Sequence, residues 1–257
     1  MWVSMPISLA FPLPHIQIVL YNRFMNYLEE TLKIAKNRDT KAAKKVQMLL
    51  RDKISLNDNT VINPHFIMGV DLAYDKDMAF VSIVLWDNIK EEIVSVFNDK
   101  GKVVFPYIPG FLSFREFPIF YQLYEKLTFE PDVIIFDGHG YAHPRRMGLA
   151  THAGILLDIP TIGCAKSKLV GTYDVPENEE NAYSELHHKN EIIGYVLRTR
   201  KNVKPIFISP GNHISFGQSL KLIISLKRKT KLPVVMQMAH RTCEAYKRSF
   251  LAIERRK

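Results

Sequence analysis

The segment PDVIIFDGHGYAHPRRMG, residues 131–148, joins a strand pattern to a run of glycine, histidine and arginine. Its four consecutive apolar residues, Val133–Phe136, predict a buried strand bounded by Pro131 and Gly138. Asp137 follows directly and lies at the carboxyl end of this strand, where open α/β sheets bind their ligands. A second aspartate, Asp71, lies inside the strand-like segment FIMGVDLAY. Because an unpaired buried carboxylate is costly, the two aspartates predict a partner or a metal ion.

The rest of the chain predicts the elements of a mixed sheet. Met25 to about Ser55 predicts one or two helices with a break near residues 37–40, and three closely spaced strands follow, which favours antiparallel hairpins. The expected elements are strands at 66–74, 79–86 and 91–97, a loop at 98–109, a helix at 112–128, the strand at 133–136, a helix at 145–158, a strand at 161–165, an exposed loop at 177–190, a strand pair at 191–200 and 205–209, and helices at 215–226 and 236–253. Three antiparallel strands followed by parallel strands alternating with helices indicate the α/β class, a ribonuclease H-like mixed sheet flanked by helices.

The chain is expected to form one domain over residues 25–257. The first 24 residues are apolar but are interrupted by Pro6, Pro12 and Pro14, and they lack the basic start of a signal peptide. They are compatible with a dispensable extension, with Met25 as an alternative start. No later segment reaches the roughly 20 apolar residues of a membrane span, so no membrane partner is expected.

Charge and cysteine content narrow the class of partner and compartment. From Lys221 onward there are eleven Lys and Arg residues against two Glu, so these 37 residues account for the whole net charge of +9. A localised basic region favours a nucleic-acid partner, and the alternative is a solvated basic surface. The two cysteines, Cys164 and Cys243, form no CxxC motif, which argues against zinc fingers and disulfide frameworks and favours the reducing cytoplasm.

Three acidic residues are candidates for a metal site. If the strand at 133–136 lies beside the strand at 66–74, Asp71 and Asp137 project into one crevice. Glu116, in GFLSFREF, would be the third acid, although an exposed helix glutamate is the simpler interpretation of it alone. Oxygen ligands without a thiolate favour Mg²⁺ or Mn²⁺ over Zn²⁺. Such a site is suited to metal-assisted phosphodiester hydrolysis.

Basic and aromatic residues surround these acids in the sequence. His143, Arg145 and Arg146 are expected at a helix start, where they would hold a phosphate, unless they form a surface basic cluster. Lys166 follows the strand at 161–165 and is expected to reach the crevice. In FPYIPG, two prolines hold Tyr107 as a candidate wedge for a base stack, the alternative being a packed loop with Tyr107 in the core.

Five segments together carry a resemblance to a known family. GVDLAY, PYIPGFLSFRE, DGHGYAHPRRMGLATHAG, GCAKSKL and SPGNHIS, in this order, resemble the motifs of endonuclease V from about Gln47 to Arg248. The resemblance implies a ribonuclease H-like fold and a Mg²⁺-dependent endonuclease, in which Mn²⁺ is expected to substitute. It implies nicking of DNA at the second phosphodiester bond 3′ of deoxyinosine, with a 5′-phosphate on the product, in DNA repair.

The resemblance also implies a role for each matching residue. Asp71, Glu116 and Asp137 would be the catalytic acids and metal ligands, with Lys166 and His240 as basic residues near the scissile phosphate. Tyr107 would be the strand-separating wedge, and His143 matches the histidine of DGxGxxHPR. The pocket for the flipped base would be lined by Leu112, Gly138, Gly140 and Leu169.

The sequence leaves the role of Asn212, the substrate and the class of function undecided. Many relatives have histidine at the place of Asn212, and His213 lies beside it. Inosine-containing RNA is the alternative substrate, and a non-catalytic binder of damaged nucleic acid or a structure-specific nuclease of the same fold is an alternative function. Because a binder has no need of buried carboxylates beside a polyanion, the acidic set favours an enzyme. The protein is expected to be a monomer.

Overall fold

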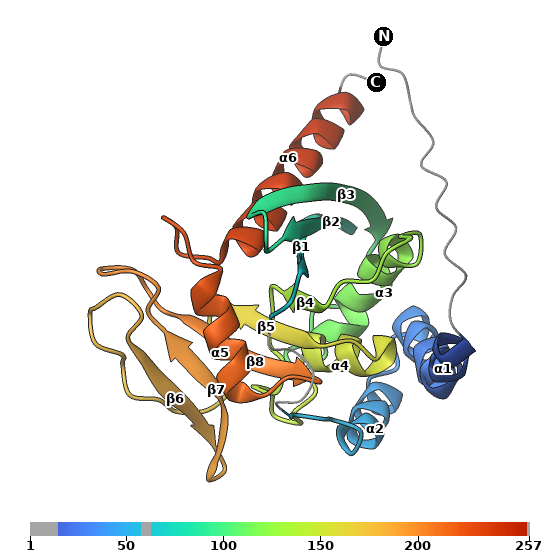
Figure 1. Ribbon diagram of the computed structural model, residues 1–257. Helices are drawn as coiled ribbons and strands as arrows, with labels where there is room; N and C mark the ends of the chain where they lie inside the picture. The colour runs from blue at the N-terminus through green and yellow to red at the C-terminus, as the bar shows by residue number, and fades with distance from the viewer. Residues whose placement is uncertain (1–14, 58–62, 256–257) are drawn as a thin grey trace.

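Eight strands form one mixed sheet at the centre of the molecule (Figure 1). The computed structural model describes residues 15–57 and 63–255, with side chains from residue 25 onward. Across the sheet the order is β3-β2-β1-β4-β5-β8-β7-β6. In chain order the strands are β1 Phe66–Asp75, β2 Met78–Asp87, β3 Glu92–Lys102, β4 Val133–Phe136, β5 Thr161–Ala165, β6 Tyr183–His188, β7 Glu191–Leu197 and β8 Ile206–Asn212.

The predicted strand at 133–136 lies in the middle of this sheet as β4. All four of its residues are buried, and β4 runs parallel to β1 with Phe136 opposite Val70. The backbone N–H of Asp137 donates to the carbonyl of Val70 at 3.1 Å, so the register continues one residue past the strand. Asp71 and Asp137 are therefore neighbours on adjacent strands, and the α/β fold class with antiparallel β1–β3 followed by parallel β4 and β5 is confirmed.

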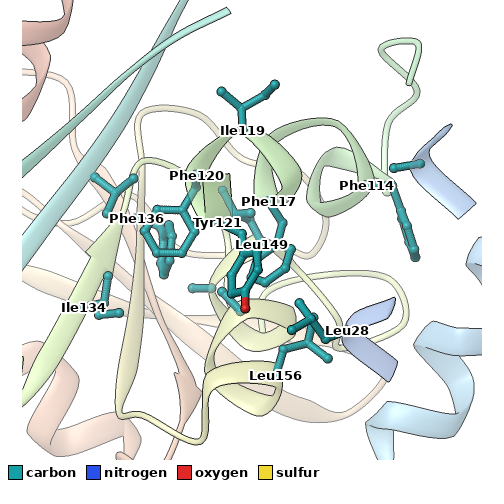
Figure 2. Close-up of a cluster of buried hydrophobic side chains, with 14 of the residues drawn as sticks. Leu28, Phe114, Phe117, Ile119, Phe120, Tyr121, Ile134, Phe136, Leu149 and Leu156 are labelled. Carbon is teal, nitrogen blue, oxygen red and sulfur yellow. The ribbon is translucent and has the colours of Figure 1, made fainter. Parts of the chain in front are cut away.

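Helices cover both faces of the sheet (Figure 1). One layer holds α1 His15–Asn37, α2 Thr40–Arg51, α3 Leu112–Tyr124 and α4 Leu149–Leu157, and the other holds α5 Phe216–Ser225 and α6 Val234–Glu254. Figure 2 shows the core of the first layer, where Phe117 and Phe120 of α3 pack with Phe136 of β4 and Leu149 of α4. This apolar packing fixes α3, and hence Glu116, against the sheet.

Alternation along β1 decides which face carries the acids. Met68 and Val70 pack with α1–α4, whereas Ile67 packs with α5 and α6. Asp71 has the parity of Ile67, so it faces α6. Gly69, on the same face, allows α6 to come close, because a Cβ there would lie 2.6 Å from Cγ2 of Val235.

The structure corrects four of the predicted elements. Helix α4 begins at Leu149 rather than Arg145, because Arg146 has a left-handed backbone with φ of 62° and cannot belong to a right-handed helix. Strand β6 lies inside the predicted loop at 177–190, because a polar edge strand lacks an apolar pattern. Strand β3 continues to Lys102 into the predicted loop at 98–109, and α3 ends at Tyr124 rather than Thr128.

The N-terminal prediction is only partly covered by the structure. The predicted helix break is confirmed, since Asp39 caps α2 by accepting from the N–H groups of Lys41 and Ala42. Helix α1 begins at His15, ahead of the predicted domain boundary at residue 25. The rest of the predicted extension, residues 1–14, lies outside the described residues, so its dispensability stays a prediction.

Candidate active site

The two neighbouring aspartates each contact a basic residue of another element. Asp71, which is 4% exposed, lies with Oδ2 2.7 Å from Nδ1 of His240 on α6. Asp137 accepts a hydrogen bond from Nζ of Lys166 at 2.5 Å, and Lys166 directly follows β5. Four elements distant in sequence therefore bring together two acids and two basic residues that the sequence assigns to one site.

Glu116 is the third acid at this place. It is buried on α3, and its Oε1 accepts a hydrogen bond of 2.6 Å from the hydroxyl of Tyr74 at the end of β1. The guanidinium of Arg115 lies over the Tyr74 ring, 4.7 Å from its centroid. Sequence reasoning missed Tyr74 and Arg115, because nothing in a strand or helix pattern shows which side chain will hold a neighbouring acid.

The three carboxyl groups influence one another electrostatically. Burial, and then the charge of Asp137, raise the pKa of Asp71 to about 6. Burial also raises the pKa of Glu116 to about 8, with both aspartates adding to the rise and the Tyr74 hydrogen bond opposing it. Mutual destabilisation of this kind is relieved by a cation, so the cluster is deficient in positive charge.

The donor set fits a hard divalent cation. Three carboxylates converge without a thiolate, which is the ligand chemistry of Mg²⁺ and Mn²⁺. Within residues 15–57 and 63–255, however, no three His, Cys, Asp or Glu side chains are arranged to coordinate an ion directly. His240 and Lys166 instead contact the carboxylates, so ion binding would require these side chains to exchange partners.

A cavity of about 360 Å³ opens beside Asp137. Residues of the loop before α3 form one wall, and residues that follow β4 and β5 form the other. Of the residues assigned from the sequence, those lining it are Tyr107, Leu112, Asp137, Gly138, His143, Lys166 and Leu169. A larger hollow of about 410 Å³, lined by Phe66, Phe97 and Phe129 among others, contains none of the acids. We place the site at the smaller cavity because Asp137 and Lys166 line it.

Tyr107 projects from the loop before α3. Its side chain is 70% exposed, so the alternative that it packs in the core is wrong. The loop is held at Phe105, whose carbonyl accepts from Nη1 of Arg115 at 2.9 Å. The Phe105 side chain itself is buried among Phe111 and Phe114. An exposed aromatic on an anchored loop fits the predicted wedge, which stays a prediction.

Gly140 is not among the residues that line the cavity, so its assignment to the base pocket stays a prediction. A Cβ at Gly140 would lie 2.3 Å from the carbonyl oxygen of Pro210 on β8. Its N–H also donates to Oγ of Ser209 at 2.9 Å. The glycine is therefore required by the close approach of two backbones. Gly138 does line the cavity, and a Cβ there would make ordinary contacts with Leu149 and Leu112.

The expected phosphate-binding group of His143, Arg145 and Arg146 is not found as such. His143 is 2% exposed, and burial, and then the Arg145 charge, lower its pKa to about 3, so its ring is neutral. Arg146 is equally buried and forms an ion pair with Glu191 of β7. The reason is the corrected helix start: His143, Arg145 and Arg146 lie in an irregular loop that leads into α4, whose N-cap is Gly148, so none of the three belongs to the first turn of that helix.

Asn212 and His213 are cross-links between the sheet and the segment after α2. Oδ1 of Asn212 accepts from the N–H of Ser55 at 2.9 Å, and the His213 N–H donates to the Ser55 carbonyl at 2.7 Å. The His213 ring contacts Asp158 at 2.7 Å. Their partners, Ser55 and Asp158, do not line the cavity.

The comparisons with known proteins agree with this geometry. The family model described as Endonuclease V matches residues 48–241. The chain belongs to the endonuclease V family. The endonuclease V of Petrotoga mobilis is 49% identical over 177 residues, covering 69% of this chain and 80% of that protein. That of Thermosipho melanesiensis is 44% identical over 206 residues, covering 80% of this chain and 90% of that protein.

Solved endonuclease V structures share the fold as well. The Bacillus subtilis endonuclease V has a TM-score of 0.78 and 34% identity, covering 85% of this chain and 98% of that one. The Ciona intestinalis endonuclease V, solved with a 24mer DNA that contains an inosine followed by a ribo-adenosine, has a TM-score of 0.71 and 26% identity, covering 80% and 97%. This chain is thus a nuclease. No helix in the described ranges is long and apolar enough to span a membrane.

Proposed function

We propose that this endonuclease V nicks DNA at the second phosphodiester bond 3′ of deoxyinosine and so begins the repair of deaminated adenine. The observation that carries the proposal is the proximity of Asp71, Glu116 and Asp137, with Asp137 lining a cavity that an exposed tyrosine borders. A buried acidic cluster next to a polyanion is unfavourable unless a cation joins it. The position of this acidic cluster next to a cavity of about 360 Å³ supports hydrolysis of a phosphodiester bond close to a flipped base.

Asp71 and Asp137 would hold the ion, with Glu116 as the third ligand or as the group that orients the attacking water. A bound Mg²⁺, for which Mn²⁺ is expected to substitute, supplies Lewis-acid polarisation of the phosphate and a more acidic bound water. Tyr74 fixes one oxygen of Glu116, Oε1, and the other, Oε2, would be the one that faces the water. Lys166 and His240, which contact the aspartates in this structure, would be the basic residues nearest the scissile phosphate once an ion occupied the site. Attack by water leaves a 5′-phosphate and a 3′-hydroxyl.

Recognition of the lesion is assigned to the two walls of the cavity. Tyr107 would fill the gap that the flipped base leaves in the duplex, since its ring is exposed and free to stack. Leu112, Gly138 and Leu169 would then contact the base, and His143 would support the loop from behind. Inosine pairs weakly, which lowers the free energy needed to extrude it.

Inosine-containing RNA is the second candidate substrate. The DNA bound to the Ciona protein carries a ribonucleotide after its inosine, which makes the sugar a natural variable to test. We further propose that the protein acts as a monomer in the cytoplasm. Both of its cysteines are free and buried, as a reducing compartment allows.

A competition between four matched strands tests the proposed substrate. Inosine or adenine is placed at the same position in otherwise identical DNA and RNA, each with its own fluorophore, and the rates are measured in one tube with Mg²⁺. We expect the inosine DNA to be cut first and the adenine strands to persist. Faster cleavage of the inosine RNA would show that RNA is the preferred substrate. Equal cleavage of all four strands would refute specificity for inosine.

A further inference from the structure

The side-chain amide of Gln47 lies behind the cavity and joins its two walls. Gln47 belongs to α2, is fully buried, and precedes the family-model match by one residue. Its Nε2 donates to the carbonyl of Gly110 at 3.1 Å and to the carbonyl of Met147 at 3.1 Å. Gly110 closes the loop that carries Tyr107, and Met147 lies in the loop after β4; both residues line the cavity.

The Gly110 carbonyl accepts from three side chains in all. Besides Gln47, Nη2 of Arg145 donates to it at 2.6 Å and Nε2 of His143 lies 3.0 Å from it. Nδ1 of His143 accepts from the backbone N–H groups of Arg145 and Met147, so the proton must be on Nε2, which donates to Gly110. Arg145 also donates through Nε to Oε1 of Gln47 at 2.6 Å. Both polar atoms of the Gln47 amide are thus engaged.

The backbone at Gly110 makes these hydrogen bonds matter for the loop. Its φ of 84° is in the left-handed region, where the chain turns from the Tyr107 loop into α3. The guanidinium of Arg145 also covers the ring of Phe111, 4.4 Å from its centroid. Together these interactions fix the direction in which the loop leaves the cavity wall.

We infer that Gln47 is a positioning residue for lesion recognition: its amide, with Arg145 and His143, sets the separation between the Tyr107 loop and the opposite wall, and therefore the width of the base pocket. This inference rests on the proposed function, because it assigns the cavity to the flipped base. Because Gln47 is fully buried, it would act on the base only through Gly110 and Met147. Without its amide, the Met147 carbonyl would lose its link to the Gly110 carbonyl, and Arg145 and His143 alone would hold the two walls together.

A purely structural role predicts a different outcome, and Asn212 supplies the matched control. Asn212 is also a buried amide, 2% exposed, and it bonds Ser55 and Gly154. Neither partner lines the cavity. Loss of the Asn212 amide should lower stability without changing how the cavity holds a base.

The test compares Gln47→Glu, Gln47→Met and Asn212→Leu with the wild-type chain. Gln47→Glu keeps the volume and the interaction with Arg145 but turns oxygen lone pairs toward the two carbonyls, whereas Gln47→Met removes all polar interactions. Three quantities are measured: the melting temperature, the Kd for adenine DNA, and the enzyme concentration that gives half the maximal single-turnover rate on inosine DNA with Mg²⁺.

For both Gln47 variants we expect the half-saturating concentration on inosine DNA to rise by about tenfold or more, since a displacement of about 1 Å in a positioned site has effects of that order. The Kd for adenine DNA should stay within about twofold of wild type, and Asn212→Leu should lower the melting temperature alone. If Gln47→Met does not fold, Gln47→Glu decides.

Two results would overturn the inference. One is a half-saturating concentration that stays at the wild-type value in folded Gln47 variants. The other is a rise that Asn212→Leu or adenine DNA reproduces. If instead wild-type protein itself fails to prefer inosine DNA, the proposed function fails first, which is a separate and recognisable outcome.

Discussion

At the scale of single residues, the acids of the site are held by specific partners. His240 contacts Asp71, Lys166 contacts Asp137, and Tyr74 donates to Glu116. The hydrogen bonds from His240 and Tyr74 lower the pKa values of Asp71 and Glu116, and so oppose the rise that burial causes. The site is therefore prepared to exchange basic side chains for a cation, and removal of one acid should weaken ion binding while it leaves the cavity intact.

Asp71→Asn and Asp137→Asn should each lower Mg²⁺-dependent cleavage of inosine DNA by roughly a hundredfold or more, which corresponds to about 3 kcal/mol. Affinity for the DNA should be kept or should increase, because a negative charge beside the phosphates is removed. Single-turnover rates and fluorescence anisotropy measure the two effects. Normal Mg²⁺-dependent cleavage by either variant would exclude that aspartate as a ligand.

Tyr107→Ala should weaken the inosine-specific part of binding by about 1–3 kcal/mol, the range of base–aromatic stacking. Because the ring is 70% exposed, the melting temperature should not change. Binding is compared on inosine and adenine duplexes of the same sequence. A substantial loss of stability, or an equal loss on both duplexes, would show that Tyr107 supports the fold rather than fills the stack.

At the scale of elements, sequence patterns locate what is apolar and periodic, and they miss what depends on partners. Strand β4 is predictable to the residue because four buried apolar residues admit little else. The start of α4 is not, because Arg146 has a left-handed backbone and forms an ion pair with Glu191 of β7, and the local sequence shows neither. Strand β6 is not predicted because its side chains are mostly polar, and the strand forms through backbone pairing with β7.

The same distinction applies to the site. Asp71 and Asp137 are predictable because an acid in an apolar strand is conspicuous, and the family resemblance supplies Glu116. Gln47 also has a signal in the sequence: Ala43, Val46, Gln47 and Leu50 are the buried residues of α2, so a glutamine occupies a core position of an amphipathic helix. The close approach of the β8 backbone to Gly140, which no sequence pattern predicts, gives that glycine a packing role beside its predicted place in the base pocket.

Substitution of two glycines, Gly140 and Gly217, tests how closely neighbouring elements pack. Gly140→Ala should destabilise the protein by about 1–3 kcal/mol, because the added Cβ meets the Pro210 carbonyl and the two backbones must separate. A Cβ added at Gly217 of α5 would have no neighbouring atom within 4 Å, so Gly217→Ala should be neutral or stabilising by up to ~1 kcal/mol. Urea unfolding measures both. An unchanged midpoint for Gly140→Ala would contradict the close approach.

At the scale of the whole molecule, the basic C-terminal region belongs to the layer formed by α5 and α6. The basic region from Lys221 onward includes α6, which packs on β1 and reaches the acids through His240. A phosphate backbone that passes the acids would therefore meet α6. Interactions with phosphates carry no sequence information, so they should strengthen binding to all DNA equally.

Neutralising Lys247 and Arg248 should weaken binding to inosine and adenine DNA alike, and the slope of log Kd against log salt should decrease by about one for each phosphate interaction removed. Arg248 should contribute more, because Lys247 is paired with Glu244 at 2.8 Å. Lys44→Ala, an exposed position on α2 in the opposite layer, is the control and should change neither quantity. A loss confined to inosine DNA would place these residues at the lesion.

We propose above that Asp71, Glu116 and Asp137 form a metal site and that the protein cuts DNA at a fixed distance from inosine. The most direct test of this proposal is to map the nick at nucleotide resolution on one inosine-containing strand while Mg²⁺ is titrated from zero. We expect no cleavage without the ion, and with it a single nick at the second phosphodiester bond 3′ of inosine, with a 5′-phosphate on the downstream fragment. Cleavage that persists in EDTA would contradict the metal site. Nicks whose position does not follow that of the inosine would contradict recognition of the inosine.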